Sequence, residues 1–357
     1  MLRAKLGDDA FFKGVALYID RHKYTNVVTS DFRRALEDAS GEALEQFFAQ
    51  WVYRPDVPRL AVEASWDEGA GALTLTARQT QGIDGQNPAF ELDLPVWVRE
   101  GGAAGAWVRA NLAIRGRETR ATVALHGAPE AIAFDPEQTV IADIACEHPA
   151  SRSATLVTEG PTYGARVQGL RGLARSKDVP AATLAMLQEV ALDKSVARSL
   201  RTEAVRTLTA LNDHQTLSSL AAVRIDAWEV REAVASGLGA LCGPGKVGGT
   251  SRNHAEKSLL SAWQKDPSTR VRATVLRSLA AMRSNEAAGL ALAATRTESQ
   301  DDELRRAAMD ALATLDTAEG LKAVIAMTRP GVLTRTRADA LGRLAGLAHH
   351  DKDAALE

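Results

Sequence analysis

Hydrophobic side chains recur at helical spacing over the first part of the chain. Phe11, Val15 and Ile19 are four residues apart and therefore lie on one face of a helix. The helical pattern continues to Pro55, where it ends because proline has no backbone N–H to donate. We expect residues 1–57 to be helical.

The hydrophobic period changes to two after Pro58. Leu60, Val62 and Ala64 alternate with polar or small residues, which is typical of a strand with one buried face. Turns that contain glycine separate several such runs at hairpin-like intervals. Six or seven short strands of this kind predict an antiparallel β-sandwich over residues 58–150. The strand-like runs are 60–66, 73–75, 90–98, 107–114, 119–125 and 139–145, and the turns are Gly69–Gly71, Asp84–Gly85 and Gly101–Gly102.

Residues 151–357 are rich in Ala, Leu and Arg and contain an internal repeat. From the first residue of each copy, the positions four, eight and eleven residues on are almost all apolar, which makes one stripe of a helix. The copies recur every 30 to 41 residues, a spacing typical of stacked helix pairs. The pattern predicts an α-solenoid that resembles HEAT repeats, with a degenerate earlier copy near Ala165–Arg166. The five sets are Leu200/Ala204/Leu208/Leu211, Val230/Val234/Leu238/Leu241, Val271/Val275/Leu279/Met282, Leu304/Ala308/Leu312/Leu315 and Thr336/Ala340/Leu344/Leu347.

An arginine follows the first position of every copy. In repeats of this type, such an arginine commonly caps or braces the neighbouring helix, because its guanidinium can bond the last helical carbonyls. A ladder of arginines that faces a ligand is the alternative interpretation. The five residues are Arg201, Arg231, Arg272, Arg305 and Arg337.

The composition is that of a globular protein, and it does not indicate a particular catalytic or binding function. Over 357 residues, 45% are hydrophobic and 25% are charged, which is ordinary for a globular protein of two or three domains. The net charge of −2 gives no reason to expect nucleic acid or an anionic membrane as a partner. The two cysteines, Cys146 and Cys242, are compatible with a reducing compartment. With no long apolar stretch and no signal core, we expect a cytoplasmic chain, although a targeting signal upstream of Met1 would not be visible.

The sequence contains no recognisable catalytic or metal-binding motif. A zinc peptidase of the His-Glu-x-x-His type needs two histidines four residues apart, and no such pair occurs among the seven histidines. His349 and His350 are adjacent, so we expect them to point away from one another in a polar tail. Cys146 and His148 lie on the same side of an extended chain, but a cysteine facing the core is favoured over a reactive thiol. We therefore predict no catalytic, cofactor-binding or metal-ligating residue in the chain. The remaining histidines are His22, His126, His214 and His254.

The segment Gly243-Pro244-Gly245-Lys246-Val247-Gly248 formally fits the glycine pattern of dinucleotide-binding loops. It follows a predicted helix instead of a strand, and it falls in the longest interval between repeat copies. We interpret it as a loop inserted between repeats.

Residues 5–60 contain a series of specific residues that helical periodicity alone would not produce. The segment resembles the last helices of the catalytic domain in the gluzincin aminopeptidases, the family of alanyl aminopeptidase and leukotriene A hydrolase. Ala128–Ile132 and Phe134–Pro136 resemble the end of the small β-domain of that family, so the resemblance covers residues 1–147. Within residues 5–60, the resemblance rests on Lys5-Leu6-Gly7-Asp8-Asp9-Ala10-Phe11, Gly14, Tyr18, Arg21-His22, Asp31-Phe32 and Gln50-Trp51-Val52-Tyr53-Arg54-Pro55.

The resemblance implies that residues 1–57 are the helical end of a thermolysin-like catalytic domain. In the family the zinc ligands lie upstream of this segment, so zinc is expected in a full-length relative and not in this chain. Met1 stands where an internal helix of the family would be, and we expect the catalytic centre to be missing. The family's Gly-x-Met-Glu-Asn motif is absent, and Tyr18, Tyr24 and Tyr53 do not match its catalytic tyrosine.

Two hypotheses from different classes follow. The first is that the chain is the C-terminal portion of a zinc aminopeptidase, which removes N-terminal residues from peptides. The chain would not be catalytic alone. Its repeat surface would contact the peptide, and its N-terminal helices would contact the missing catalytic part. The second is a HEAT-repeat scaffold without chemistry that binds another protein. In the second case the N-terminal aromatic residues would be partly exposed. These are Phe11, Phe47, Phe48 and Trp51.

Overall fold

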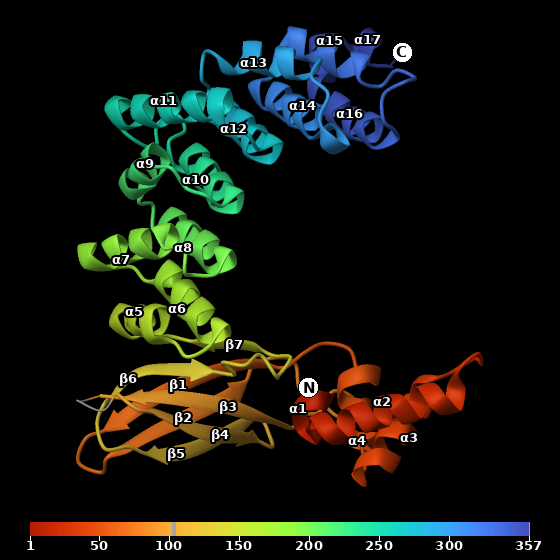
Figure 1. Ribbon diagram of the computed structural model, residues 1–357, viewed down its shortest axis with the longest axis vertical. Helices are drawn as coiled ribbons and strands as arrows, with labels where there is room; N and C mark the ends of the chain where they lie inside the picture. Colours follow the sequence, from red (N-terminus) through yellow and green to blue (C-terminus); the bar gives the residue numbers. More distant parts are fainter. Residues whose placement is uncertain (102–104, 357) are drawn as a thin grey trace. The chain divides into compact units, whose positions relative to one another are not determined.

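The computed structural model describes residues 1–101 and 105–356 of the chain. It separates into two compact units, Met1–Gly172 and the part from Leu173 onward, and each is described by itself (Figure 1). Gly102, one of the predicted turn residues, lies outside the described residues.

The N-terminal helices form as the hydrophobic pattern predicts. Their shared core contains Leu36, Leu44 and Phe48, so the partial exposure that the scaffold hypothesis expects is wrong for Phe48. Gly14 permits the close approach of two of these helices, since a Cβ there would lie 2.7 Å from Cδ2 of Leu36. The helices are α1 (Leu2–Leu6), α2 (Asp8–His22), α3 (Thr29–Ser40), α4 (Glu45–Phe48) and the π-helix η1 (Ala49–Tyr53).

Two β-sheets follow and share one hydrophobic core that includes Leu75, Phe90 and Val96. One sheet has the strand order β5-β2-β1-β7 and the other has the order β4-β3-β6. Strands β1 and β7 run parallel, with Leu60 opposite Ile144, so the prediction of a wholly antiparallel arrangement is wrong at this edge. The strands are β1 (Arg59–Asp67), β2 (Ala72–Gln79), β3 (Leu92–Glu100), β4 (Trp107–Ile114), β5 (Glu118–Ala124), β6 (Pro129–Phe134) and β7 (Asp143–Cys146).

Strand β6 is not among the predicted strand runs. Its residues are buried on both faces, so they do not alternate between apolar and polar. Ile132 and Phe134 face the core between the sheets, while Ala131 and Ala133 pack against Leu156 of α5 (Ala150–Glu159). The helix covers a face that the alternating pattern would leave to solvent.

The second unit consists of packed helices (Figure 1). The predicted stripes are confirmed, because the first three apolar positions of each of the first four copies are buried. In the last copy Thr336, Ala340 and Leu347 are buried. Helix α6 (Tyr163–Arg175) crosses the division between the units. The others are α7 (Ala181–Leu192), α8 (Arg198–Ala210), α9 (His214–Ala222), α10 (Trp228–Leu241), α11 (Gly249–Lys265), α12 (Thr269–Ala281), α13 (Ala287–Ala294), α14 (Glu303–Leu315), α15 (Ala318–Ala326), α16 (Thr334–Leu347) and α17 (Lys352–Leu356), with the 3₁₀ turns η2 (Gln300–Asp302) and η3 (Ala348–His350).

None of the helices in the described part of the chain combines the length and the hydrophobicity that crossing a bilayer requires.

Candidate functional site

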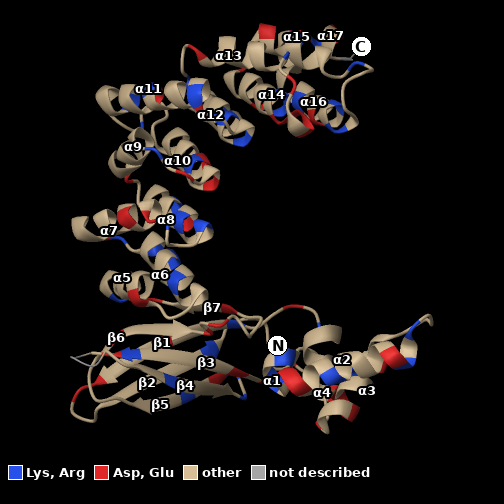
Figure 2. Cartoon of the chain, in the orientation of Figure 1, with Lys and Arg blue, Asp and Glu red and all other residues tan. Residues whose placement is uncertain are grey.

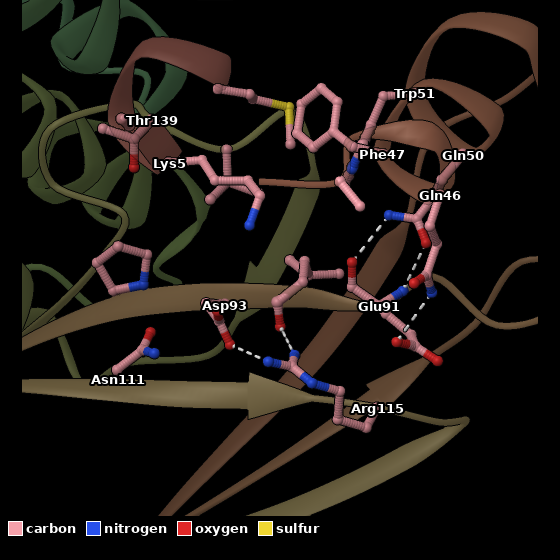
Figure 3. A pocket seen from close by; sticks show the side chains of 16 residues that line it. Lys5, Gln46, Phe47, Gln50, Trp51, Glu91, Asp93, Asn111, Arg115 and Thr139 are labelled. Atoms are coloured by element: carbon pink, nitrogen blue, oxygen red, sulfur yellow. Dashed lines mark hydrogen bonds and ion pairs between the residues drawn. The ribbon is translucent and has the colours of Figure 1, made fainter. Parts of the chain in front are cut away.

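A cavity of about 530 Å³ lies between the N-terminal helices and the sheet that contains β3 and β4. Lys5 lies on one side, Gln46 and Trp51 lie on another, and Asn111 lies on strand β4 (Figure 3). Met1 also lines the cavity. The residues that line the cavity all belong to the first unit. The volume suits a small molecule or a short peptide segment.

Two glutamines fix the helical wall of the cavity to the sheet. The side chain of Gln50 donates to the backbone carbonyl of Glu91 at 2.8 Å and accepts from the backbone N–H of Glu91 at 2.8 Å. Gln46 donates to the Glu91 carboxylate at 3.2 Å (Figure 3). The reciprocal pair imitates one step of a β-ladder, so Gln50 of η1 satisfies the backbone N–H and C=O of Glu91, directly before β3.

Two aromatic rings, those of Phe47 and Trp51, line the cavity, and Phe90 packs against Trp51. The ring centroids of Trp51 and Phe90 are 5.3 Å apart, and those of Phe47 and Trp51 are 6.3 Å apart. Arg54 lies over the ring of Phe90, with its guanidinium carbon 3.6 Å from the ring centroid. Burial lowers the pKa of Arg54 from its usual value.

The charged groups at the mouth of the cavity are paired with one another. Arg115 donates to Asp93 at 2.5 Å and to the backbone carbonyl of Leu92 at 2.9 Å. Lys5 pairs with Glu42 at 3.0 Å. Among the described lining residues there is no nucleophile bonded to a base and no converging set of metal ligands. The cavity has the size and the polar lining of a ligand-binding pocket.

The sequence does not single out these lining residues. In the sequence, Gln46, Gln50 and Glu91 look like ordinary surface residues. Gln50 and Glu91 are 41 residues apart, so their contact leaves no local pattern. A helix with two glutamines one turn apart is the available signal, but nothing in the sequence identifies the partner strand.

The Cys146 thiol lies at the end of β7 and packs against the core between the sheets. Its Sγ lies 3.9 Å from Nδ1 of His148, so the two residues do share a side as the extended spacing predicts. Burial raises the pKa of Cys146 to about 12 and lowers the pKa of His148 to about 4. Both shifts oppose a thiolate–imidazolium pair, and the packing of Cys146 against the core supports the structural interpretation.

The repeat arginines brace neighbouring helices, as the favoured interpretation predicts. Arg201 donates to the carbonyl of Ala191 at 3.0 Å and to Asp226 at 2.7 Å, and its side chain is 2% exposed. Arg305 donates to the carbonyl of Thr295 at 3.1 Å, and Arg337 to that of Thr328 at 3.1 Å. An arginine buried as deeply as Arg201 cannot belong to a ladder that faces a ligand.

The other two repeat arginines, Arg231 and Arg272, also contact neighbouring elements, but through different partners. Arg231 holds both oxygens of Asp266, at 2.7 and 3.0 Å, and also donates to the carbonyl of Ile225. Arg272 instead lies over the ring of Trp263, 4.8 Å from its centroid. In the view of Figure 2, Lys and Arg are interspersed with Asp and Glu along α14 and α16, which fits cross-bracing between helices.

The glycine-rich segment is a helix connection, as predicted. It links α10 to α11, and Lys246 donates to the carbonyl of Ala240 near the end of α10 at 2.7 Å. This bond gives the lysine a capping role.

One cluster of possible metal ligands occurs in the described residues. Asp316, His349 and His350 bring one donor atom each within 4.8 Å of one another. The expectation that the adjacent histidines point apart is wrong, because the tight 3₁₀ turn places both rings on one side, with centroids 4.1 Å apart.

Comparison with known proteins places these observations in a family context. The sequence profile of the Peptidase family M1 domain matches residues 1–51. Aminopeptidase N of Lactococcus lactis subsp. lactis is 38% identical over 79 residues, which is 22% of this chain and 9% of the relative. The chain resembles the M1 aminopeptidases.

Two further comparisons extend the resemblance. The puromycin-sensitive aminopeptidase of Caenorhabditis elegans is 28% identical over 124 residues, or 34% of this chain and 13% of that protein. The crystal structure of Legionella pneumophila aminopeptidase A in complex with aspartic acid matches 97% of this chain and 46% of its own, with a TM-score of 0.67 and 12% identity. At that identity the match shows a similar fold, and the aligned segments cover only a small part of the curated relatives.

Proposed function

We propose that this chain acts as the C-terminal portion of a zinc-dependent aminopeptidase, which removes N-terminal residues from peptides. In this proposal the N-terminal helices complete a catalytic domain, the two sheets form a spacer of the β-sandwich type, and the helical repeats form a HEAT-like solenoid that limits access to short peptides. The match of residues 1–51 to the M1 domain and the fold likeness to an aminopeptidase support it.

The observation that carries the proposal is an exposed apolar surface on the helices that match the M1 domain. Phe12 and Ile19 lie two turns apart on one face of α2 and are 52% and 57% exposed. The loop between α2 and α3 adds Tyr24, Val27 and Val28, and η1 adds Val52 and Tyr53. Exposed apolar side chains that form one contiguous patch mark a contact with another protein surface, and the proposal takes these seven residues as such a patch. The remaining part of an M1 catalytic domain is the occupant that the family match supports.

The residues of this chain do not fit a catalytic zinc centre. The sequence has no histidines four residues apart, and no three possible ligands converge among the described residues of the first unit. We therefore assign no catalytic step to this chain. Its contribution is structural: it supplies helices, a spacer and a surface beside the substrate path.

The decisive experiment identifies the polypeptide that carries this sequence in its source cells. An antibody against the repeat unit is used to isolate it, and mass spectrometry reads every peptide recovered. The proposal expects a His-Glu-x-x-His peptide on the same or a tightly bound polypeptide, together with release of N-terminal residues from peptides that 1,10-phenanthroline abolishes. A free 357-residue polypeptide without such activity would contradict it.

A metal-free interaction protein is the second candidate. The regular helix pairs of the second unit favour it, because repeats of this kind present an extended surface to other proteins. The contradicting outcome of the same experiment would support this alternative.

A further inference from the structure

The C-terminal end of the second unit gathers three metal-ligating side chains that take no part in the proposed function. Asp316 ends α14, while His349 and His350 form the turn η3 directly after α16. Nε2 of His350 lies 2.9 Å from Oδ1 of Asp316, and Nε2 of His349 lies 3.2 Å from the same oxygen.

These separations are those of ordinary hydrogen bonds or ion pairs, and they are also only slightly shorter than a shared cation would require. In a tetrahedral zinc site with bonds of about 2.0–2.1 Å, neighbouring donor atoms are about 3.3 Å apart. The two Nε2–Oδ1 separations are close to that length, and all three donors lie within 4.8 Å of one another. Two imidazole nitrogens and one carboxylate oxygen form a donor set that zinc accepts and that magnesium does not favour.

The backbone around the cluster also favours positive charge. Helices α14 and α16 both end at the cluster, and the C-terminus of a helix carries a partial negative charge. Arg283 already brings one positive charge to the end of α14, where it donates to the carbonyl of Leu315 at 3.0 Å. In the described part of the chain, the side chains that pair with the Asp316 carboxylate are those of the two histidines.

Asp316 is a residue type suited to the backbone conformation at its position. Asp316 has a φ of 57°, in the left-handed region that aspartate and asparagine tolerate better than most residues. The side chains of His349, His350 and Asp316 are 57%, 23% and 47% exposed, so a metal ion reaches them from solvent.

We propose that Asp316, His349 and His350 form a zinc site that ties the end of α16 to the end of α14, with solvent in the fourth position. Zinc there stabilises the packing of α16 against α14. The proposal is independent of the aminopeptidase function, since its test measures metal affinity of this chain and not peptide hydrolysis.

The test is titration of the full 357-residue chain with Zn²⁺ alone by isothermal calorimetry at about pH 7.5. We expect one saturable site of micromolar dissociation constant and no comparable binding of Mg²⁺. Asp316→Asn keeps a residue that tolerates the left-handed region and removes the charge, and His350→Gln removes an imidazole. Each should weaken zinc binding at least tenfold, while His126→Gln, which removes an exposed histidine of the first unit, should leave it unchanged.

A thermal melt separates metal binding from folding. Wild type and the two ligand variants should melt alike without metal, and a hundredfold excess of Zn²⁺ over the dissociation constant should raise the Tm of wild type alone by a few degrees. No saturable binding, or equal affinity in wild type and both variants, would reduce the cluster to an ion pair and overturn the proposal.

Discussion

Burial decides what individual titratable residues of this chain can do. His148 stacks on Phe134 at 5.9 Å with nearly parallel rings, and the neighbouring Arg152 adds a like charge. The loss of solvation and then that charge lower the pKa of His148 to about 4. The imidazole stays neutral where an exposed histidine would be half protonated.

This shift predicts a pH dependence of stability. With a folded pKa near 4 against about 6.5 when unfolded, the unfolded chain binds the proton more tightly, so stability is present above pH 6.5 and is lost as the pH falls toward 4. Between pH 7 and pH 4 the wild type should lose about 3 kcal/mol of unfolding free energy through this histidine, and His148→Gln should abolish that part of the loss. Urea unfolding measures it, and an unchanged pH profile in this variant would contradict it. His126→Gln is the exposed control.

The Cys146 thiol should resist modification. Its pKa of about 12 leaves almost no thiolate at pH 8, and burial also raises the pKa of Cys242. A disulfide reagent should therefore react with both cysteines in urea within minutes and with neither in the folded chain on that timescale. Cys242→Ala assigns any remaining reaction to Cys146. Rapid labelling of the folded variant would restore the reactive-thiol interpretation.

At the scale of elements, the sequence predicts those helices and strands that bury one face only. The helix stripes from Leu200 to Leu347 are predictable because each helix buries one face, so period and burial coincide. Strand β6 is not, since α5 covers its outer face and removes the alternation. The docking of Gln50 on Glu91 is also invisible, because a contact 41 residues away leaves no local pattern.

Burial also distinguishes the arginines of a single helix. Arg201 and Arg198 both lie on α8, but their side chains are 2% and 69% exposed. Arg201→Ala removes two bonds and leaves the carbonyl of Ala191 buried without its donor, so we expect a loss of about 3 kcal/mol in unfolding free energy. Arg198→Ala loses an exposed contact of 3.7 Å and should change it by less than about 0.5 kcal/mol. Chemical unfolding followed by circular dichroism compares the two, and equal effects would contradict a bracing role.

At the scale of the whole molecule, each compact unit has a core of its own. The core between the sheets belongs to the first unit, and Trp51 of η1 packs against it beside Phe90. The buried cluster around Met309 and Val324 belongs to the second. Two separate cores favour two unfolding transitions in place of one.

This organisation predicts that a substitution in one unit shifts one transition only. Trp51→Ala removes an aromatic side chain from the junction of the helices and the sheets, and should lower the free energy of unfolding by about 2–3 kcal/mol in the transition of the first unit. Tyr53→Ala, two residues away and 60% exposed, should leave both transitions in place. Arg201→Ala should lower the other transition alone. Calorimetry resolves the two, and a single transition that moves equally with Trp51→Ala and Arg201→Ala would show that the chain unfolds as one cooperative body.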